Sequence, residues 1–330
     1  MQDVADLARV GSATVERVLN GRGGVRPATV EKVIAAARKL DYPKHLPELH
    51  RGVTRIEVLM LRPELSFISR LSKSFERISA NLHPSISVHR TFLNEGDPIS
   101  IAKRILNPAT RRSALLVALP QHAAIRDALE AVEAGGIPVI QVMTRLEALD
   151  VPYVGIDNQA AGRMAGLMMA GMQRAQGSVA ALCHSQIYGV HRDRLRGFSD
   201  FMPRPQAAHL SFQQAAFTHD DEAEMAKVAS QLIRDMPDLV GLYCAGGDYG
   251  QLCDMLRSIQ SRREICLIGH ELTEQSAAAL RDGTISAIID QAPETQARRA
   301  LDTALHKLRL LETEIDPSPI RFITITADNL

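Results

Sequence analysis

From Arg55 onward, short apolar runs alternate with longer stretches of helical periodicity, and this alternation limits the possible folds more than any other feature of the chain. Strands that alternate with helices are typical of repeated β-α-β units around parallel sheets. The runs fall into two series, which predict two doubly wound α/β lobes: RIEVLML (55–61), SISVHRTF (85–92), SALLVAL (113–119) and IPVIQV (137–142), then SVAALC (178–183), DLVGLYC (238–244) and ICLIG (265–269).

The segments between these runs carry helix signals. In DALEAVEAG, Leu129 and Val132 recur at helical spacing before two glycines, and Pro138 then opens a strand. Ligands of such sheets bind outside the carboxyl ends of the strands, and with two lobes they bind in the cleft between them. We therefore expect any ligand site on the loops that follow the strands.

The part of the chain before Arg55 has a different, wholly helical pattern. Helices are expected over about 3–8, 12–19 and 27–40, and Pro27 suits the first turn of the third. That third helix carries one apolar stripe at i, i+3, i+4 and i+7: Val30, Val33, Ile34 and Ala37. The segment YPKHLPELHRG (42–52), with two prolines and several charges, predicts a linker between this small head and the lobes.

Charge and cysteine content narrow the class of protein. The formal net charge is zero, but residues 1–55 hold ten basic against six acidic side chains, which leaves 28 against 32 for the rest. Neither an apolar signal segment nor a run of eighteen apolar residues occurs, so the sequence predicts a cytoplasmic protein that neither enters nor crosses a membrane. Four cysteines lack metal-ligand spacing and are expected to be buried free thiols: Cys183, Cys244, Cys253 and Cys266.

Residues 3–21, DVADLARVGSATVERVLNG, have the pattern of a helix-turn-helix. Small Ala5 and Ala8 allow the first helix to pack closely on the second, whose outer face then stays free for the major groove of DNA. Arg17 can form a bidentate contact with guanine, and Arg22 and Arg26 are placed for phosphates. The predicted DNA-binding positions of the head are Ser12, Ala13, Thr14, Glu16, Arg17, Asn20, Arg22 and Arg26. The alternative is a helical pair that merely caps the first lobe.

The same stretch closely resembles the head of lactose-repressor (LacI) family transcriptional regulators, with the signature DVA, two residues, AGVS, two residues, TVSRVLN. The likeness continues through VRPATVEKVIAAARKLDY, and the two-lobed region resembles the family's core, which is similar to sugar-binding proteins of the ribose-binding type. The resemblance implies a homodimer with two helix-turn-helix heads on a roughly palindromic operator, and an effector bound between the lobes.

The expected organisation has three parts. Residues 1–41 form the DNA-binding head, 42–54 a hinge or linker, and 55–330 the effector-binding and dimerisation domain. Within that domain, lobe 1 is expected over about 55–156 and 292–318, and lobe 2 over about 157–291, with 319–330 near the crossover.

Several departures from the family pattern affect the head. The family has Gly and Ser where this chain has Arg9 and Gly11, and a serine in place of Glu16, so we expect Ser12 to cap the second helix and the operator preference to differ. The family also has residues before DVA, which predicts a start upstream of Met1. Leu49 best matches the family's hinge leucine, which enters the minor groove, although the matching segment is two residues short and contains Pro47.

For the effector, the strongest candidate is the stretch YGVHRDRLRGF. Arg194 lies where the similar sensors place an arginine that forks onto adjacent sugar hydroxyls, and Arg192 is a neighbouring possibility. The alternative is a solvated basic start of a helix.

Other effector candidates follow the remaining strands, and each has a structural alternative. Asp157 and Asp248 are either hydroxyl acceptors or helix caps, and Phe67 is either a stacking platform or a core residue. The remaining positions that the resemblance implies are Arg145, Asn158, Gly247, His270, Glu271, Asp290 and Gln291.

Together these patterns predict a DNA-binding regulator, by default a repressor of carbohydrate uptake or catabolism that a sugar or polyol releases from its operator. The alternatives are a regulator responding to a purine or another metabolite, and a solute-binding protein without DNA function. An enzyme is not expected, because GxGxxG after a strand, GxSxG, phosphate-loop and HExxH motifs are missing from the sequence. No metal or cofactor is expected.

Overall fold

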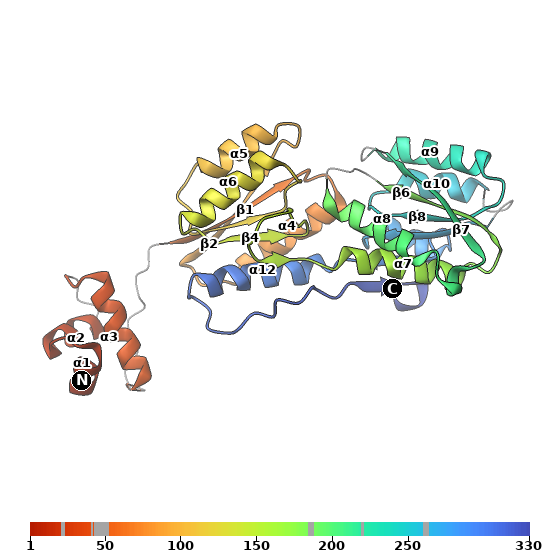
Figure 1. The fold of residues 1–330 in the computed structure, drawn as a ribbon. Helices are drawn as coiled ribbons and strands as arrows, with labels where there is room; N and C mark the ends of the chain where they lie inside the picture. The colour runs from red at the N-terminus through yellow and green to blue at the C-terminus, as the bar shows by residue number, and fades with distance from the viewer. Residues whose placement is uncertain (21–23, 41, 43–52, 184–187, 219–220, 260–263) are drawn as a thin grey trace. The chain divides into compact units, whose positions relative to one another are not determined.

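The computed structural model describes residues 1–20, 24–40, 42, 53–183, 188–218, 221–259 and 264–330. The chain divides into two compact units, Met1–Thr54 and Arg55–Leu330, each drawn in Figure 1. Among the described residues, none of the helices has the length and apolar character needed to cross a membrane.

The first unit is a three-helix head formed by α1 (Gln2–Ala8), α2 (Ser12–Leu19) and α3 (Pro27–Lys39). The helices enclose one small apolar core, to which all three contribute: Val4, Ala5, Ala8, Val15, Val18, Leu19, Val33, Ile34, Ala36 and Ala37. Val30 packs against this core from its edge, so the apolar stripe expected on α3 is confirmed.

The turn between α1 and α2 depends on backbone geometry rather than on side-chain caps. Arg9 ends α1 in the left-handed conformation at φ 56°, and the Val10 N–H donates to the Ala5 carbonyl across 3.0 Å. Gly11 occupies the N-cap of α2, and no side chain caps it. The expectation that Ser12 caps the helix was wrong, because the helix already begins at Ser12.

Lobe 1 has a five-stranded sheet in the order β2-β1-β3-β4-β5, with helices on both faces. Its elements are β1 (Thr54–Leu61), α4 (Ser66–Ser79), β2 (Ile86–Leu93), α5 (Pro98–Leu106), β3 (Ala114–Val117), α6 (Ala123–Ala134), β4 (Val139–Val142), β5 (Tyr153–Val154) and, from later in the chain, α12 (Pro293–Lys307). Figure 1 shows α5 and α6 on one side of the sheet and α4 and α12 on the other.

Strand β1 illustrates why the strand sequences are apolar at successive positions. Ile56, Val58 and Met60 pack in the cluster that includes α4 and α12, whereas Leu59 and Leu61 pack in the cluster of α5 and α6. Side chains of a strand alternate between the two faces, so a sheet covered on both faces requires apolar residues at successive positions.

Lobe 2 has a six-stranded sheet in the order β11-β10-β9-β8-β6-β7, parallel except for the antiparallel pair β10 and β11. Its elements are α7 (Asn158–Met172), β6 (Gly177–Cys183), α8 (Gly189–Phe201), β7 (Leu210–Phe217), α9 (Glu222–Asp235), β8 (Leu239–Cys244), α10 (Gly250–Ile259), β9 (Cys266–His270), α11 (Glu274–Arg281), β10 (Ala287–Asp290) and β11 (Ile323–Ile325). The parallel α/β architecture with two sheets is as the sequence predicts.

Helices α7 and α8 approach each other closely at two glycines. A Cβ built on Gly162 would lie 1.9 Å from the carbonyl oxygen of Arg194, and one built on Gly197 would lie 2.0 Å from that of Gln159. Real side chains do not fit at such distances, so both positions require glycine for this packing.

The chain passes between the lobes at three points. It leaves lobe 1 after β5, returns after β10 into α12, and ends in lobe 2 with β11. The first and third crossovers lie side by side, since the Ile320 N–H donates to the Gly155 carbonyl across 2.8 Å. Helix α12 packs against α4, β3, β4 and β5, so lobe 1 is completed by residues that follow lobe 2 in the sequence.

Four strands were not among the expected runs. They are β5, β7, β10 and β11, of which β5, β7 and β11 lie at the edges of their sheets. All four cysteines are buried and free, as expected.

Candidate functional site: a reading helix and an interlobe cavity

The outer face of α2 is free of the head's core. Ser12, Ala13, Glu16, Arg17 and Asn20 are exposed, whereas the core positions of the same helix are buried. Thr14 is half-buried and Arg26 is exposed. Arg22 and Leu49, the other two predicted DNA contacts, lie outside the described residues. The exposed face therefore presents one arginine, one carboxylate and short polar side chains.

The second unit contains a cavity of about 70 Å³ between its lobes. Its lining comes from the ends of strands and the starts of helices: Leu65, Ser66, Phe67, Ile68, Met143, Tyr188, Val190, His191, Arg194, Gly247, Asp248, Glu271 and Gln291. In a doubly wound fold the carboxyl ends of parallel strands meet at one edge, which explains how segments far apart in sequence converge here.

Three lining residues adopt left-handed backbone conformations. Met143, Asp248 and Glu271 have φ values of 67°, 58° and 67°, a region that residues other than glycine seldom occupy. All three directly follow or lie close to the end of a strand. Such conformations persist only where the surroundings enforce them, and they concentrate at ligand sites.

Arg194 is the largest fully buried side chain of the molecule's described part, with 2% of its surface exposed. Its Nε donates to Asn158 Oδ1 across 2.9 Å, and its Nη1 donates to the Ala245 carbonyl across 2.7 Å. The remaining Nη2 has no hydrogen-bond partner among the described residues. The guanidinium is thus fixed by lobe 2 with one terminal nitrogen left at the cavity.

Three further buried polar atoms at the cavity also lack hydrogen-bond partners among the described residues: Ser66 Oγ, Glu271 Oε2 and Gln291 Oε1. The other ends of Glu271 and Gln291 bond to each other, with Gln291 Nε2 donating to Glu271 Oε1. Of these atoms, Glu271 Oε2 lies 3.9 Å from Arg70 Nη1, an ion pair without a hydrogen bond. Buried polar atoms normally form hydrogen bonds, so four that form none around one cavity indicate a place for a polar ligand.

Contacts across the cleft hold the lobes together around this cavity. The Ser66 N–H at the start of α4 donates to Asp248 Oδ2 across 3.0 Å. Arg70, one turn further along α4, forms an ion pair with Asp290 at 2.5 Å and donates to the Leu272 carbonyl at 3.0 Å. The described arrangement is therefore one in which the lobes are joined over the cavity.

Comparison with known proteins agrees with both units. Residues 95–311, more than half of the chain, match the family model of the periplasmic binding protein domain. The chain belongs to the periplasmic binding protein domain family. Its residues 1–44 match the model of bacterial regulatory proteins of the lacI family, and the helix-turn-helix of α1 and α2 lies within that match.

Relatives of this family member include a transport protein and a repressor. It is 27% identical over 204 residues to the ribose import binding protein RbsB of Bacillus subtilis, a match that covers 61% of this chain and 65% of the relative. It is 24% identical over 250 residues to the ribose operon repressor of Halalkalibacterium halodurans, covering 74% of this chain and 71% of that one. The chain thus spans just under two thirds of the import protein's length.

A solved structure shows the same fold. The glucose-galactose binding protein GanP of Geobacillus stearothermophilus superposes with a TM-score of 0.75 at 17% identity, covering 85% of this chain and 99% of GanP.

The structure brings half of the predicted effector residues to the cavity. These are Phe67, Arg194, Gly247, Asp248, Glu271 and Gln291. Asn158 lies behind them and orients Arg194. Asp157 instead caps α7, accepting from the Ala160 N–H across 2.8 Å, which is the structural alternative that the sequence left open.

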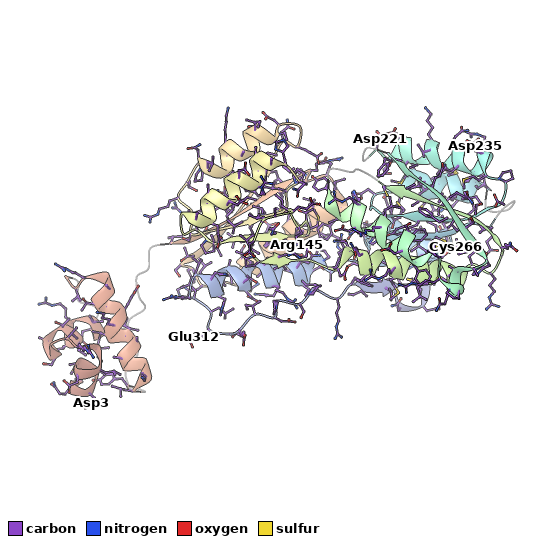
Figure 2. The ribbon with its side chains drawn as sticks, viewed as in Figure 1. Asp3, Arg145, Asp221, Asp235, Cys266 and Glu312 are labelled. Carbon is purple, nitrogen blue, oxygen red and sulfur yellow. The ribbon has the colours of Figure 1, made fainter. Side chains whose placement is uncertain are left out.

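Besides Asn158 and Asp157, four more predicted positions do not line the cavity. His270 is fully buried beneath it, with Nε2 2.9 Å from the Tyr243 hydroxyl, because a residue next to Glu271 on a strand end points to the other face. Asp290 forms an ion pair with Arg70 at the lobe contact instead. Arg145, labelled in Figure 2, is exposed after β4 and lines a separate surface depression with Arg192, whose guanidinium pairs with Glu147 at 2.6 Å.

The sequence did not single out several residues that the structure places here. They are Arg70 at the lobe contact and Leu65, Ser66, Ile68 and Met143 at the cavity. Tyr188, Val190 and His191 also line the cavity, and they lie in the stretch YGVHRDRLRGF that the sequence put forward as a whole. Ser66 and Ile68 flank Phe67 in the first turn of α4, so the loop that suggested Phe67 also carried the signal for its neighbours.

Glu271 has the most perturbed carboxyl group of the cavity. Burial and the nearby Asp290 charge raise its pKa to about 8, although Arg194, Gln291 and Arg70 act in the opposite direction. The folded protein therefore holds a proton that the unfolded chain has lost between about pH 4.5 and 8.

The folded state binds this extra proton, so a rise in pH through that window should lower the free energy of unfolding. We expect the contribution of Glu271 to be about 1.4 kcal/mol per pH unit. In Glu271→Gln this loss disappears, and urea unfolding at pH 5 and pH 8 measures it. Exposed Glu274, in the first turn of α11, provides the control, because Glu274→Gln should keep the wild-type pH dependence. An unchanged pH dependence in Glu271→Gln would contradict the assignment.

Proposed function

We propose that this protein is a sequence-specific transcriptional repressor of a carbohydrate uptake or catabolism operon, whose operator affinity is controlled by a sugar or polyol bound between the lobes. The observation that carries this proposal is the combination, in one chain, of an exposed helix face in the head with a buried interlobe cavity that holds four polar atoms without hydrogen bonds. The helix face alone would indicate only a DNA-binding protein, and the cavity alone would indicate only a ligand-binding protein.

The DNA side of the proposal rests on the exposed face of α2. Arg17 projects from that face, with Glu16 and Asn20 as its exposed neighbours. Arginine reads guanine through two parallel hydrogen bonds in the major groove, and asparagine can do the same with adenine. Arg26, at the entry to α3, is suited to a phosphate.

The effector side rests on the chemistry of the unpaired atoms. Arg194 Nη2 is a donor and Gln291 Oε1 an acceptor, whereas Ser66 Oγ and Glu271 Oε2, whose carboxyl holds a proton below about pH 8, can act as either. Vicinal hydroxyls offer both roles at once. The ribose-related names of two relatives support the same class of ligand.

Coupling of the two sites is the remaining part of the proposal. A ligand that bridges Ser66 of lobe 1 and Arg194 of lobe 2 favours the closed arrangement, and in a homodimer a change of lobe closure alters the spacing or order of the two heads. Ligand and operator then change each other's affinity by the same factor.

Operator binding measured with and without ligand tests the proposal. The probe is a duplex selected by the full-length protein from random DNA, and the ligands are pentoses, hexoses and polyols. We expect one of them to weaken operator binding at saturation. If a ligand binds the protein but leaves operator affinity unchanged, the proposed coupling between the two sites is contradicted.

Arg17 gives the matching test on the DNA side. We expect Arg17→Ala to lose about 1–3 kcal/mol of operator affinity per head, since it deletes a bidentate base contact, while ligand affinity is unchanged. Arg17→Lys keeps the charge but not the planar fork, so it should retain nonspecific DNA binding and lose discrimination. Wild-type discrimination in Arg17→Ala would move the reading surface away from α2.

A further inference from the structure

We propose that Arg70 is a positioning residue of the effector site, which holds the two lobes closed without touching the effector and so sets how fast the effector enters and leaves. This inference rests on the proposed function, because it concerns the ligand of the same cavity. It comes from the contacts that the Arg70 guanidinium makes across the cleft and from the enclosure of the cavity beside them.

Arg70 connects both lobes. From α4 in lobe 1, its Nη1 reaches Asp290 Oδ2 at 2.5 Å and donates to the Leu272 carbonyl across 3.0 Å, both in lobe 2. Its Nη2 lies 3.4 Å from Glu294 Oε2 in the first turn of α12, a helix that packs on α4 within lobe 1. The guanidinium therefore has one anchor in its own lobe and two partners in the other.

The contacts of Arg70 are made with protein groups rather than with the effector. Arg70 is not part of the cavity lining, and the Oε2 of the cavity residue Glu271 lies 3.9 Å from Nη1, which is beyond hydrogen-bond range. None of these contacts needs a ligand atom. Arg70 can therefore stabilise the closed arrangement to the same extent with and without a bound effector, and the effector shifts the equilibrium further towards closure.

Closure depends on the positive charge of Arg70. Asp290 is 3% exposed and Glu271 is 2% exposed, so the closed lobes bury two carboxyl groups beside the guanidinium. Removing one partner of a buried ion pair leaves the other charge uncompensated, which is strongly unfavourable. When the lobes separate, water reaches this junction. Loss of Arg70 should therefore shift the equilibrium towards the open arrangement, by about tenfold or more.

The start of α4 provides a reporter of closure. The N-cap residue, Leu65, does not cap the helix with its side chain, and the Ser66 N–H instead donates to Asp248 Oδ2 of lobe 2 across 3.0 Å. Separation of the lobes breaks this hydrogen bond and exposes the Ser66 N–H to water. Its rate of hydrogen exchange therefore measures the open fraction.

The cavity is accessible only when the lobes separate, because Phe67, Arg194, Glu271 and Gln291 of its lining are each at most 6% exposed. A sugar therefore enters and leaves through the open arrangement. Since Arg70 disfavours that arrangement before and after binding, its loss should raise both the association and the dissociation rate constant. A lost ligand contact would instead raise the dissociation rate constant alone.

Amide hydrogen exchange of the full-length protein, measured without sugar, tests the closing role. In Arg70→Gln we expect the Ser66 N–H to exchange about threefold or more faster than in wild type. Arg90→Gln is the matched control, because Arg90 pairs with Glu76 of the same helix at 3.0 Å but within lobe 1. Its Ser66 N–H should exchange at the wild-type rate. A wild-type rate in Arg70→Gln would overturn the inference.

Helix α6 separates opening from unfolding, because it lies on the other face of the lobe 1 sheet from α4. Its exchange should be equal in Arg70→Gln and wild type, and faster exchange throughout both lobes would overturn the inference. Arg70→Lys keeps the charge but not the planar fork, so its Ser66 N–H should exchange at a rate between those of wild type and Arg70→Gln.

Stopped-flow binding of D-ribose provides a second measurement, with this sugar as the probe because two relatives carry ribose in their names. In Arg70→Gln we expect the dissociation rate constant to rise about tenfold or more and the association rate constant about threefold or more. In wild type both should also rise with salt concentration, since salt screens the Arg70 ion pairs and D-ribose is uncharged. Faster dissociation with unchanged association would make Arg70 a ligand contact and overturn the inference.

The two proposals fail separately. Operator release by a sugar, together with wild-type exchange in Arg70→Gln, would overturn the role of Arg70 and leave the proposed function in place. Faster exchange in Arg70→Gln, together with the failure of every sugar and polyol to bind, would overturn the carbohydrate effector and leave the closing role of Arg70.

Discussion

Gly197→Ala should lower the free energy of unfolding of the two-lobed unit by about 3 kcal/mol, since overpacking against immovable atoms lies at the upper end of such effects. The new Cβ would meet the Gln159 carbonyl oxygen at 2.0 Å, and Gly162 repeats the situation against the Arg194 carbonyl at 1.9 Å. Both obstacles are backbone atoms, so no side-chain rotation relieves them and α7 must separate from α8.

Thermal unfolding of the purified protein measures this effect, with an expected fall in melting temperature of about 6–12 °C. Gly171 on the same helix α7 is the matched control, because the space around its Cβ position is open. Gly171→Ala should be neutral or stabilising by up to about 1 kcal/mol, since alanine favours helix more than glycine. Similar melting temperatures for the two variants would show that the α7–α8 contact is not as close as described.

The second large effect is expected at the cavity, where Arg194→Ala should reduce effector affinity by at least about 2 kcal/mol, or roughly thirtyfold. The side chain is 2% exposed, and its Nη2 is a donor at the cavity without a hydrogen-bond partner among the described residues. Arg192→Ala is the natural comparison two residues away. Arg192 is 55% exposed and pairs with Glu147 outside the cavity, so its loss should change affinity little.

Two readouts separate a local effect from unfolding. Operator affinity of Arg194→Ala should stay at the wild-type value, and Arg194→Lys, which keeps charge and most of the volume, should bind effector less tightly than wild type because it lacks the planar fork. If Arg194→Ala bound the effector as well as wild type and Arg192→Ala did not, the ligand site would lie in the surface depression beside Arg145 rather than in the cavity.

The sequence predicts a strand best when helices cover both faces of its sheet, because such a strand is then apolar along its whole length. Strands with two buried faces, such as β1 and β6, appear as continuous apolar runs and were expected from the sequence alone. Strand β7, LSFQQAAF, mixes polar and apolar residues without strict alternation at the edge of its sheet and is mostly half-buried or exposed. It gives no such run, and β5 and β11 are too short to give one.

The candidate site divides in a similar way. The resemblance to sugar-binding sensors implied Glu271 and Gln291, and each directly follows a parallel strand, where the topology places a residue at the cleft. One position earlier the same reasoning fails, because His270 turns its side chain into the core. Arg70 could not be nominated, since its role depends on a partner 220 positions away that becomes a neighbour only when the lobes meet.

The return of α12 to lobe 1 has a consequence for synthesis of the chain. A ribosome delivers β1 to β5 first, but the face of their sheet that bears Ile56, Val58 and Met60 lacks part of its cover until Ala297, Ala300 and Leu301 have emerged. Lobe 2, by contrast, is translated nearly whole in the interval. Lobe 2 can therefore fold before lobe 1 is complete. Until α12 emerges, an apolar face of the lobe 1 sheet stays partly exposed while more than half of the chain is synthesised.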